Sequence, residues 1–118
     1  MNWEALVAAA VLVWGLITWP ITVLEETEPP RPGVLANTTF DGEICFIHVY
    51  PSHWAAEYDP QFIVTHEVGH CLAIPHIDQP GIMNRFYAPG TEFSGYDRAE
   101  FWHHYPAPYR IAVPMVGQ

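Results

Sequence analysis

Two histidines and a glutamate stand together near the middle of the chain. The segment reads His66-Glu67-Val68-Gly69-His70. On a helix, His66 and His70 would lie one turn apart on one face, so both imidazoles would reach one metal ion. Glu67 would stand beside the first ligand, within reach of a metal-bound water. This spacing is the H-E-x-x-H pattern of zinc sites, and it requires a helical context.

A third histidine completes a ligand set. His76 follows His70 after the dipeptide Ile74-Pro75. The residue before a proline is pushed out of the helical region, so the chain would turn there and bring His76 back to the metal. Three histidine ligands leave the fourth position of a tetrahedral ion open for water, as in catalytic zinc sites. We therefore expect Zn²⁺ to be held by His66, His70 and His76.

The elements that must position these residues have local signals of their own. Asp59 is a good N-cap and Pro60 suits the first helical position, which predicts a helix from Pro60 to about Leu72. The β-branched and aromatic run over residues 44–50 predicts a strand. The pattern Ser94-x-x-Asp97 predicts the start of a second helix through a capping box.

The first 24 residues predict a different kind of element. The chain carries no charge from Ala5 to Leu24, and Trp3 and Trp19 lie near the two ends of this stretch. A helix of that length would cross a hydrocarbon core of roughly 30 Å, and indoles favour the membrane interface. We expect residues 1–24 to form a transmembrane anchor. A cleaved signal peptide is one alternative, although a basic n-region is absent, and a buried core helix is the other.

Length and composition limit the number of domains and the classes of partner. The chain has 118 residues, and its 13 Asp and Glu against 4 Lys and Arg give a net charge of −9. This length suits one small domain, and the absence of a basic patch argues against binding to nucleic acid. Residues 25–43 are rich in Pro and polar residues, which predicts an extended linker. Residues 44–118 would then form the folded domain.

The central segment resembles the metzincin zinc endopeptidases, whose signature is H-E-x-x-H-x-x-G-x-x-H followed by a Met-turn. The residues that match are His66, Glu67, His70 and His76, with Gly81-Ile82-Met83-Asn84 in the place of the Met-turn. The segment from Ser94 to Tyr105 is similar to the C-terminal helix of the matrixin-like branch. The resemblance covers about residues 44–105, and it implies that Met83 forms an apolar floor beneath the metal.

The resemblance implies a fold and an activity. The fold would be a reduced, metzincin-like α+β catalytic domain, with an active-site helix, a small sheet and a C-terminal helix, behind the N-terminal transmembrane helix. The activity would be that of a zinc-dependent endopeptidase, with Glu67 as the general base that takes a proton from the water. Strand 44–50 would be the sheet edge to which a peptide or protein substrate adds. The loop from Asn84 to Phe93 would shape the pocket on the leaving-group side.

Three departures from the family pattern are visible. The glycine of the signature is Ala73 here, at a position that usually needs a positive φ. A tyrosine that follows the Met-turn as a metal ligand in some branches is replaced by Arg85. The domain is also small, and small domains often need a metal or a partner chain for stability. Either the domain is a minimal version of the fold, or the membrane through residues 5–24 or another chain completes it.

Other interpretations remain open at this point. The metal could instead stabilise a non-catalytic module that binds a peptide or a partner chain. The H-E-x-x-H match could also be accidental. Cys45 and Cys71 could form a disulfide, or they could be two small buried hydrophobes. We expect the protein to be membrane-anchored with its catalytic domain outside the cytoplasm, or secreted if residues 1–24 are cleaved.

Overall fold

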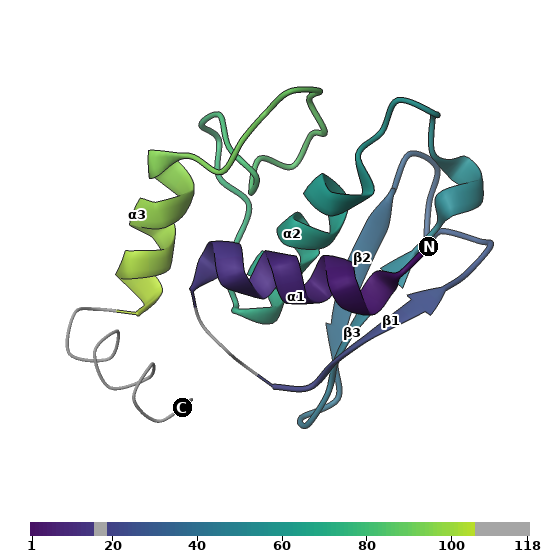
Figure 1. The fold of residues 1–118 in the computed structure, drawn as a ribbon, viewed down its shortest axis with the longest axis horizontal. Helices are drawn as coiled ribbons and strands as arrows, with labels where there is room; N and C mark the ends of the chain where they lie inside the picture. Colours follow the sequence, from purple (N-terminus) through teal and green to yellow (C-terminus); the bar gives the residue numbers. More distant parts are fainter. Residues whose placement is uncertain (16–18, 106–118) are drawn as a thin grey trace.

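The computed structural model describes residues 1–15 and 19–105. These residues form a small α+β domain in which helices α1 and α2 cover one face of a three-stranded sheet (Figure 1). The elements are α1 (Trp3–Trp14), β1 (Ile21–Glu25), β2 (Ala36–Phe40), β3 (Cys45–Val49), the short 3₁₀ turn η1 (Pro51–His53), α2 (Pro60–Cys71) and α3 (Gly95–His104). Residues 106–118, for which the sequence predicts no element, lie outside the described residues.

The sheet has the strand order β1-β3-β2. β1 runs parallel to β3, and β2 runs antiparallel to it. The strand predicted over residues 44–50 is confirmed, and its residues Cys45, Ile47 and Val49 are buried against the helices. The expectation that this strand forms the sheet edge is wrong, because β3 is paired on both sides. β2 is an edge strand instead, and it lies within the predicted linker 25–43.

The predicted transmembrane helix is also wrong. α1 has 12 residues and ends at Trp14, where Gly15 adopts the left-handed conformation with φ 82° and caps the helix. A helix of this length spans about 18 Å, well short of a hydrocarbon core of about 30 Å. After Pro20, the residues from Ile21 to Glu25 pair with β3 as a strand. No helix in the described ranges is long and apolar enough to cross a membrane.

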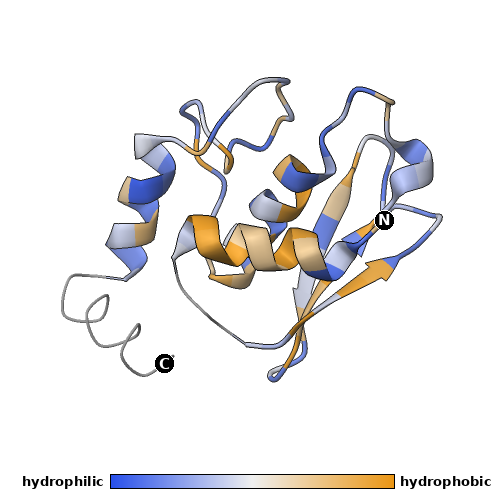
Figure 2. Ribbon diagram, in the orientation of Figure 1, coloured by the Kyte–Doolittle hydropathy of each residue, from blue (hydrophilic) through white to orange (hydrophobic). Residues whose placement is uncertain are grey.

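The apolar character of α1 serves the protein core. Figure 2 shows α1 as largely hydrophobic along its length. Trp14 is completely buried, and its indole nitrogen donates a hydrogen bond to the carbonyl of Thr65 on α2, at 2.9 Å. The prediction of a membrane anchor is therefore replaced by a helix that packs on α2. The alternative of a buried core helix agrees with this packing, whereas cleavage of residues 1–24 would remove α1 and most of β1 from the core.

The two helices predicted in the second half of the chain are confirmed. Asp59 caps α2 by accepting a hydrogen bond from the backbone N–H of Gln61, at 2.9 Å. Ser94 and Asp97 form the predicted capping box at the start of α3. Phe101 on α3 is buried, and this anchors the second helix against the core.

Candidate metal centre and cleft

Helix α2 places two of the three predicted ligands on one face. His66 and His70 lie one turn apart, and their Nε2 atoms are 3.1 Å from each other. Both side chains are partly buried at the base of a cleft. The geometry follows from the helical period, as the spacing of the two histidines predicts.

The end of α2 turns the chain so that His76 joins them. The N–H of Ile74 donates to the carbonyl of Gly69 and the N–H of Ala73 donates to the carbonyl of His70, both at 2.9 Å. These two bonds form a Schellman motif, which requires a left-handed residue after the helix. Ala73 has a φ of 64° and takes that place. The conformation expected for the family's glycine is thus present here with an alanine.

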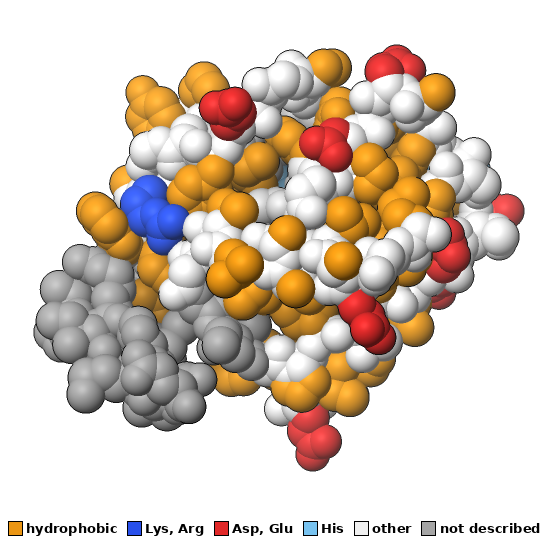
Figure 3. All heavy atoms as spheres, in the orientation of Figure 1, with side chains coloured by type: hydrophobic (Ala, Val, Ile, Leu, Met, Phe, Trp, Pro, Cys, Tyr) orange, Lys and Arg blue, Asp and Glu red, His pale blue; other side chains and the backbone are white. Residues whose placement is uncertain are grey.

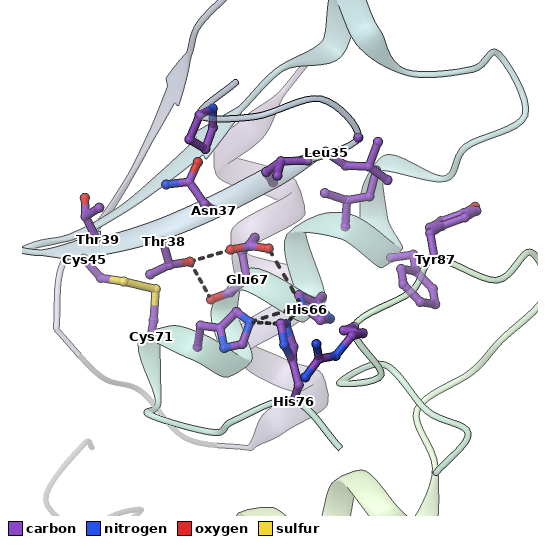
Figure 4. A pocket seen from close by; sticks show the side chains of 18 of the residues that line it. Leu35, Asn37, Thr38, Thr39, Cys45, His66, Glu67, Cys71, His76 and Tyr87 are labelled. Atoms are coloured by element: carbon purple, nitrogen blue, oxygen red, sulfur yellow. Dashed lines mark hydrogen bonds and ion pairs between the residues drawn. A yellow bond between two sulfur atoms is a disulfide. The ribbon is translucent and has the colours of Figure 1, made fainter. Parts of the chain in front are cut away.

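The three imidazoles converge on one point. The Nε2 atom of His76 lies 3.3 Å from that of His66 and 3.2 Å from that of His70 (Figure 4). Tetrahedral zinc with Zn–N bonds of 2.0–2.1 Å separates its nitrogen ligands by about 3.3 Å. These three residues could therefore hold a metal ion, and their spacing fits zinc.

Hydrogen bonds fix the rings in the orientation that a metal needs. The Nδ1 atom of His66 lies 2.5 Å from the carbonyl oxygen of Ile82, and that of His70 lies 2.9 Å from the carbonyl oxygen of Ile74. A carbonyl accepts only, so Nδ1 carries the proton in both rings, and Nε2 presents a lone pair to the centre. Two of the three ligands are thus held as the neutral tautomer that binds metals.

Burial also favours the neutral imidazoles. It lowers the pKa of His66 to about 4, helped by the neighbouring His70. Burial is also the main reason why the pKa values of His70 and His76 are lowered. At neutral pH the cluster is therefore uncharged and does not have to release protons before it binds a cation.

Glu67 stands beside the cluster as predicted. Its carboxyl group is buried, with one oxygen 3.9 Å from Nε2 of His66. The other oxygen accepts a hydrogen bond of 2.6 Å from the hydroxyl of Thr38 on β2 (Figure 4). Burial raises the pKa of Glu67 to about 7, and the bond from Thr38 opposes this shift. A carboxyl group with such a pKa can both take up and release a proton near neutral pH.

Thr38 was missed by the sequence argument. Its segment reads as part of a linker, and nothing in the local sequence distinguishes it from Thr39 beside it. The role of Thr38 depends on the pairing of β2 with β3, which places this residue on the helix side of the sheet. The alternation of side chains along a strand is the sole signal, and it is informative only once the register is known.

The predicted Met-turn packs beneath α2. Met83 is completely buried, and its sulfur lies so close to Gly69 that a Cβ added there would approach it to 2.4 Å. The buried carboxylate of Asp97 accepts hydrogen bonds from the backbone N–H groups of Ile82 and Met83, at 2.8 and 2.9 Å. Asp97, expected as a capping residue alone, thus also joins α3 to the turn that carries Met83.

The cluster opens into a cleft of about 1080 Å³. It is lined by the edge strand β2 with the loop before it, by α2, and by residues 85–87, and Figure 4 shows Thr38 of β2 and Tyr87 on opposite sides of His66. Tyr87, in the loop expected to shape a pocket, packs on Phe62 with ring centroids 4.7 Å apart. A cleft of this size accommodates several residues of an extended chain.

A disulfide links the two sides of this region. Cys45 at the start of β3 is bonded to Cys71 at the end of α2, with 5.9 Å between their Cα atoms. The sequence left this pairing open. A cross-link between residues that are 26 positions apart stabilises a domain by about 3.5 kcal/mol. It ties the helix that carries the histidines to the central strand.

The remaining histidines lie away from the cluster. The side chain of His48 pairs with Glu26, and His53 bonds to the carbonyl of Thr27. His103 and His104 are on α3.

Comparison with known protein families, curated proteins and solved structures finds no significant match to this chain.

Proposed function

We propose that this chain is a zinc-dependent endopeptidase. The observation that carries the proposal is the convergence of three imidazole nitrogens beside a buried glutamate at the base of an open cleft. A structural zinc site is normally closed by four protein ligands, whereas three histidines leave one position for water or substrate. The resemblance of residues 66–83 to the metzincin signature supports the same activity.

His66, His70 and His76 would hold the ion through their Nε2 atoms. When bound, zinc supplies a Lewis acid that strongly lowers the pKa of water, to about 7, and polarises the scissile carbonyl. Glu67 then acts as the general base. Its free oxygen takes the proton of the attacking water, and the same group passes the proton to the nitrogen of the leaving amine.

Thr38 is a positioning residue in this scheme. Its hydroxyl holds one carboxylate oxygen of Glu67, so that the other remains directed towards the histidines. The bond also favours the charged form of Glu67, which is the form that accepts a proton. The edge strand therefore contributes to the orientation and the basicity of the general base.

The same edge strand would hold the substrate. Among the described strands, none pairs with the outer edge of β2, and this edge lines the cleft. An extended peptide can add there as a further strand, with its main chain bonded to β2 and one of its peptide bonds above the cluster. Binding through the main chain suits an endopeptidase, since it requires no free chain end.

The test compares the full chain with a variant of the general base. The zinc-loaded protein, with its disulfide intact, is incubated with a reduced and alkylated unfolded protein, and new amino termini are counted. We expect Glu67→Ala to lower kcat/KM about 100- to 10 000-fold while it retains one zinc per chain. Glu57→Ala, which changes an exposed glutamate in a loop, is the matched control and should cleave normally.

Two results would contradict the proposal. Cleavage by Glu67→Ala at the wild-type rate would show that another group, or a contaminant, performs the reaction. A wild-type chain that holds one zinc and cleaves nothing would favour the non-catalytic binding module instead.

A further inference from the structure

Positive charge is scarce in this protein, and it is distributed unevenly. The chain has four arginines, no lysine and a net charge of −9. Arg31 and Arg85 both line the cleft, where Glu67 is the sole acidic residue of the described lining. Acidic side chains are instead scattered over the face that carries α1 (Figure 3). The cleft is thus a positive region on a negative protein.

The two arginines keep their hydrogen-bond donors available. Both side chains are exposed, and within the described ranges neither guanidinium forms an ion pair, although acidic residues outnumber basic ones. Arg98 differs, because its guanidinium donates to the carbonyls of Val13 and Trp14 at the end of α1, both at 2.8 Å. An unpaired guanidinium in a cleft offers a planar fork of donors that fits a carboxylate.

The two positions lie at different places along the cleft. Arg85 is two positions after the buried Met83 and lines the cleft together with His76. Arg31 lies in the loop between β1 and β2, on the wall where a substrate strand would add. One arginine therefore lies on the side of the cleft that residues 85–87 form, and the other lies on the side of β2.

We propose that the cleft selects peptide segments with acidic side chains, and that Arg85 pairs with a carboxylate close to the cleaved bond while Arg31 pairs with another on the β2 side. The inference rests on the proposed function and names its substrate class. A basic side chain at either position would meet a like charge, and Glu67 is the sole acidic residue of the described lining. The net charge of −9 repels acidic peptides at long range, so the preference must come from these local contacts.

The experiment measures cleavage preference at an ionic strength of about 0.15 M, at which charges more than about 8 Å apart are largely screened. Peptides of one scaffold carry Glu, Gln or Lys at each position within three residues of the cleaved bond. We expect Glu to be preferred over Gln at two positions. Arg85→Gln should lower the Glu-to-Gln ratio of kcat/KM at one of these positions and Arg31→Gln at the other, each by about fivefold.

Two controls separate the local contact from the change in net charge. Ser52→Asp, on the exposed 3₁₀ turn outside the cleft, changes the net charge by the same amount as Arg85→Gln and should leave the ratio unchanged. Arg85→Lys keeps the charge without the planar fork and should retain part of the preference. A chain without preference for Glu, or a preference that survives in the double variant Arg31→Gln/Arg85→Gln, would overturn the inference.

A binding measurement distinguishes this failure from failure of the proposed function. Zinc-loaded Glu67→Ala is titrated with the fluorescent Glu and Gln peptides, and affinity is read from anisotropy. If the wild type cleaves no peptide but the Glu peptide binds more tightly, and the double variant removes that difference, the peptidase proposal fails and the acidic specificity stands. Equal binding of the two peptides would overturn the specificity, whatever the cleavage result.

Discussion

The two halves of the domain contribute to the site in different ways. In the C-terminal half, residues 59–105, the contacts that bring the three candidate ligands together are local, and His66 and His76 are only 10 positions apart. In the N-terminal half, residues 1–50, the contacts to the site are distant in sequence. Trp14 reaches Thr65 across 51 positions, and the disulfide spans 26. The arrangement of the three histidines therefore depends on contacts that are close in sequence, whereas the packing that supports the site depends on contacts that are distant in sequence.

This difference predicts that substitutions in the two halves have different effects. Changes in the N-terminal half should affect stability or the state of Glu67 while the affinity for metal is retained in the folded protein. Changes among the histidines should remove the metal first. The following variants test that separation.

The largest effect is expected from the helix once predicted to cross a membrane. Trp14 is completely buried, whereas Leu12 on the same helix is 81% exposed. We expect Trp14→Ala to lower the free energy of unfolding by about 3–5 kcal/mol, measured by urea denaturation, and Leu12→Ala to change it little. Equal effects of the two variants would mean that α1 is not part of the core.

The next largest effect on the free energy of unfolding is expected from a substitution at Gly69, where residues of the two halves are in contact. A Cβ added to Gly69 would come within 2.4 Å of the sulfur of Met83 and 2.7 Å of the Trp14 ring, whereas one on Gly95 would meet nothing within 4 Å. Gly69→Ala should therefore lower the free energy of unfolding by about 1–3 kcal/mol. Gly95→Ala is the control, and a similar loss in both variants would rule out the predicted clash.

A smaller effect, on the rate of catalysis, is expected from a substitution on β2. Thr38→Val removes the hydrogen bond to Glu67 and keeps the shape of the side chain. Loss of a bond to a charged group should lower kcat/KM by about tenfold with zinc affinity unchanged. The bond lowers the pKa of Glu67, so its removal raises this pKa and moves the acidic limb of the kcat/KM profile to higher pH. Thr22→Val on β1, exposed and outside the cleft, should shift neither quantity.

The smallest effect belongs to the turn before His76. Ala73 has a positive φ, a conformation that glycine adopts with less strain. Ala73→Gly should raise the free energy of unfolding by about 0.5–1 kcal/mol. Ala56 does not share the positive φ, so Ala56→Gly should lower it through the entropy of the unfolded chain. A loss of stability in Ala73→Gly would contradict the assigned strain.

The elements that sequence predicted correctly are those with local signals. The cap at Asp59, the box at Ser94 and the strand around Ile47 each depend on residues within a few positions of one another. The convergence of His66, His70 and His76, which could hold a metal ion, likewise needs only a helical period and one turn. The periodicity of a short segment contains this information before any tertiary contact forms.

The errors concern elements whose role depends on distant partners. An apolar run can cross a membrane or pack in a core, and the run alone does not decide between them. Gly15 and Pro20 interrupt this one, and they were signals of a helix end that the composition outweighed. The edge position of β2 and the role of Thr38 depend on strand order, which no local pattern specifies.

The central claim is that three histidines hold one zinc ion with a position left open. X-ray absorption at the zinc edge of the loaded, full-length chain tests it most directly. We predict one zinc per chain with three imidazole nitrogens at about 2.0–2.1 Å, and loss of one imidazole in His76→Ala but not in His103→Ala. A zinc shell without imidazole, or a chain that retains no zinc after free metal is removed, would contradict the account.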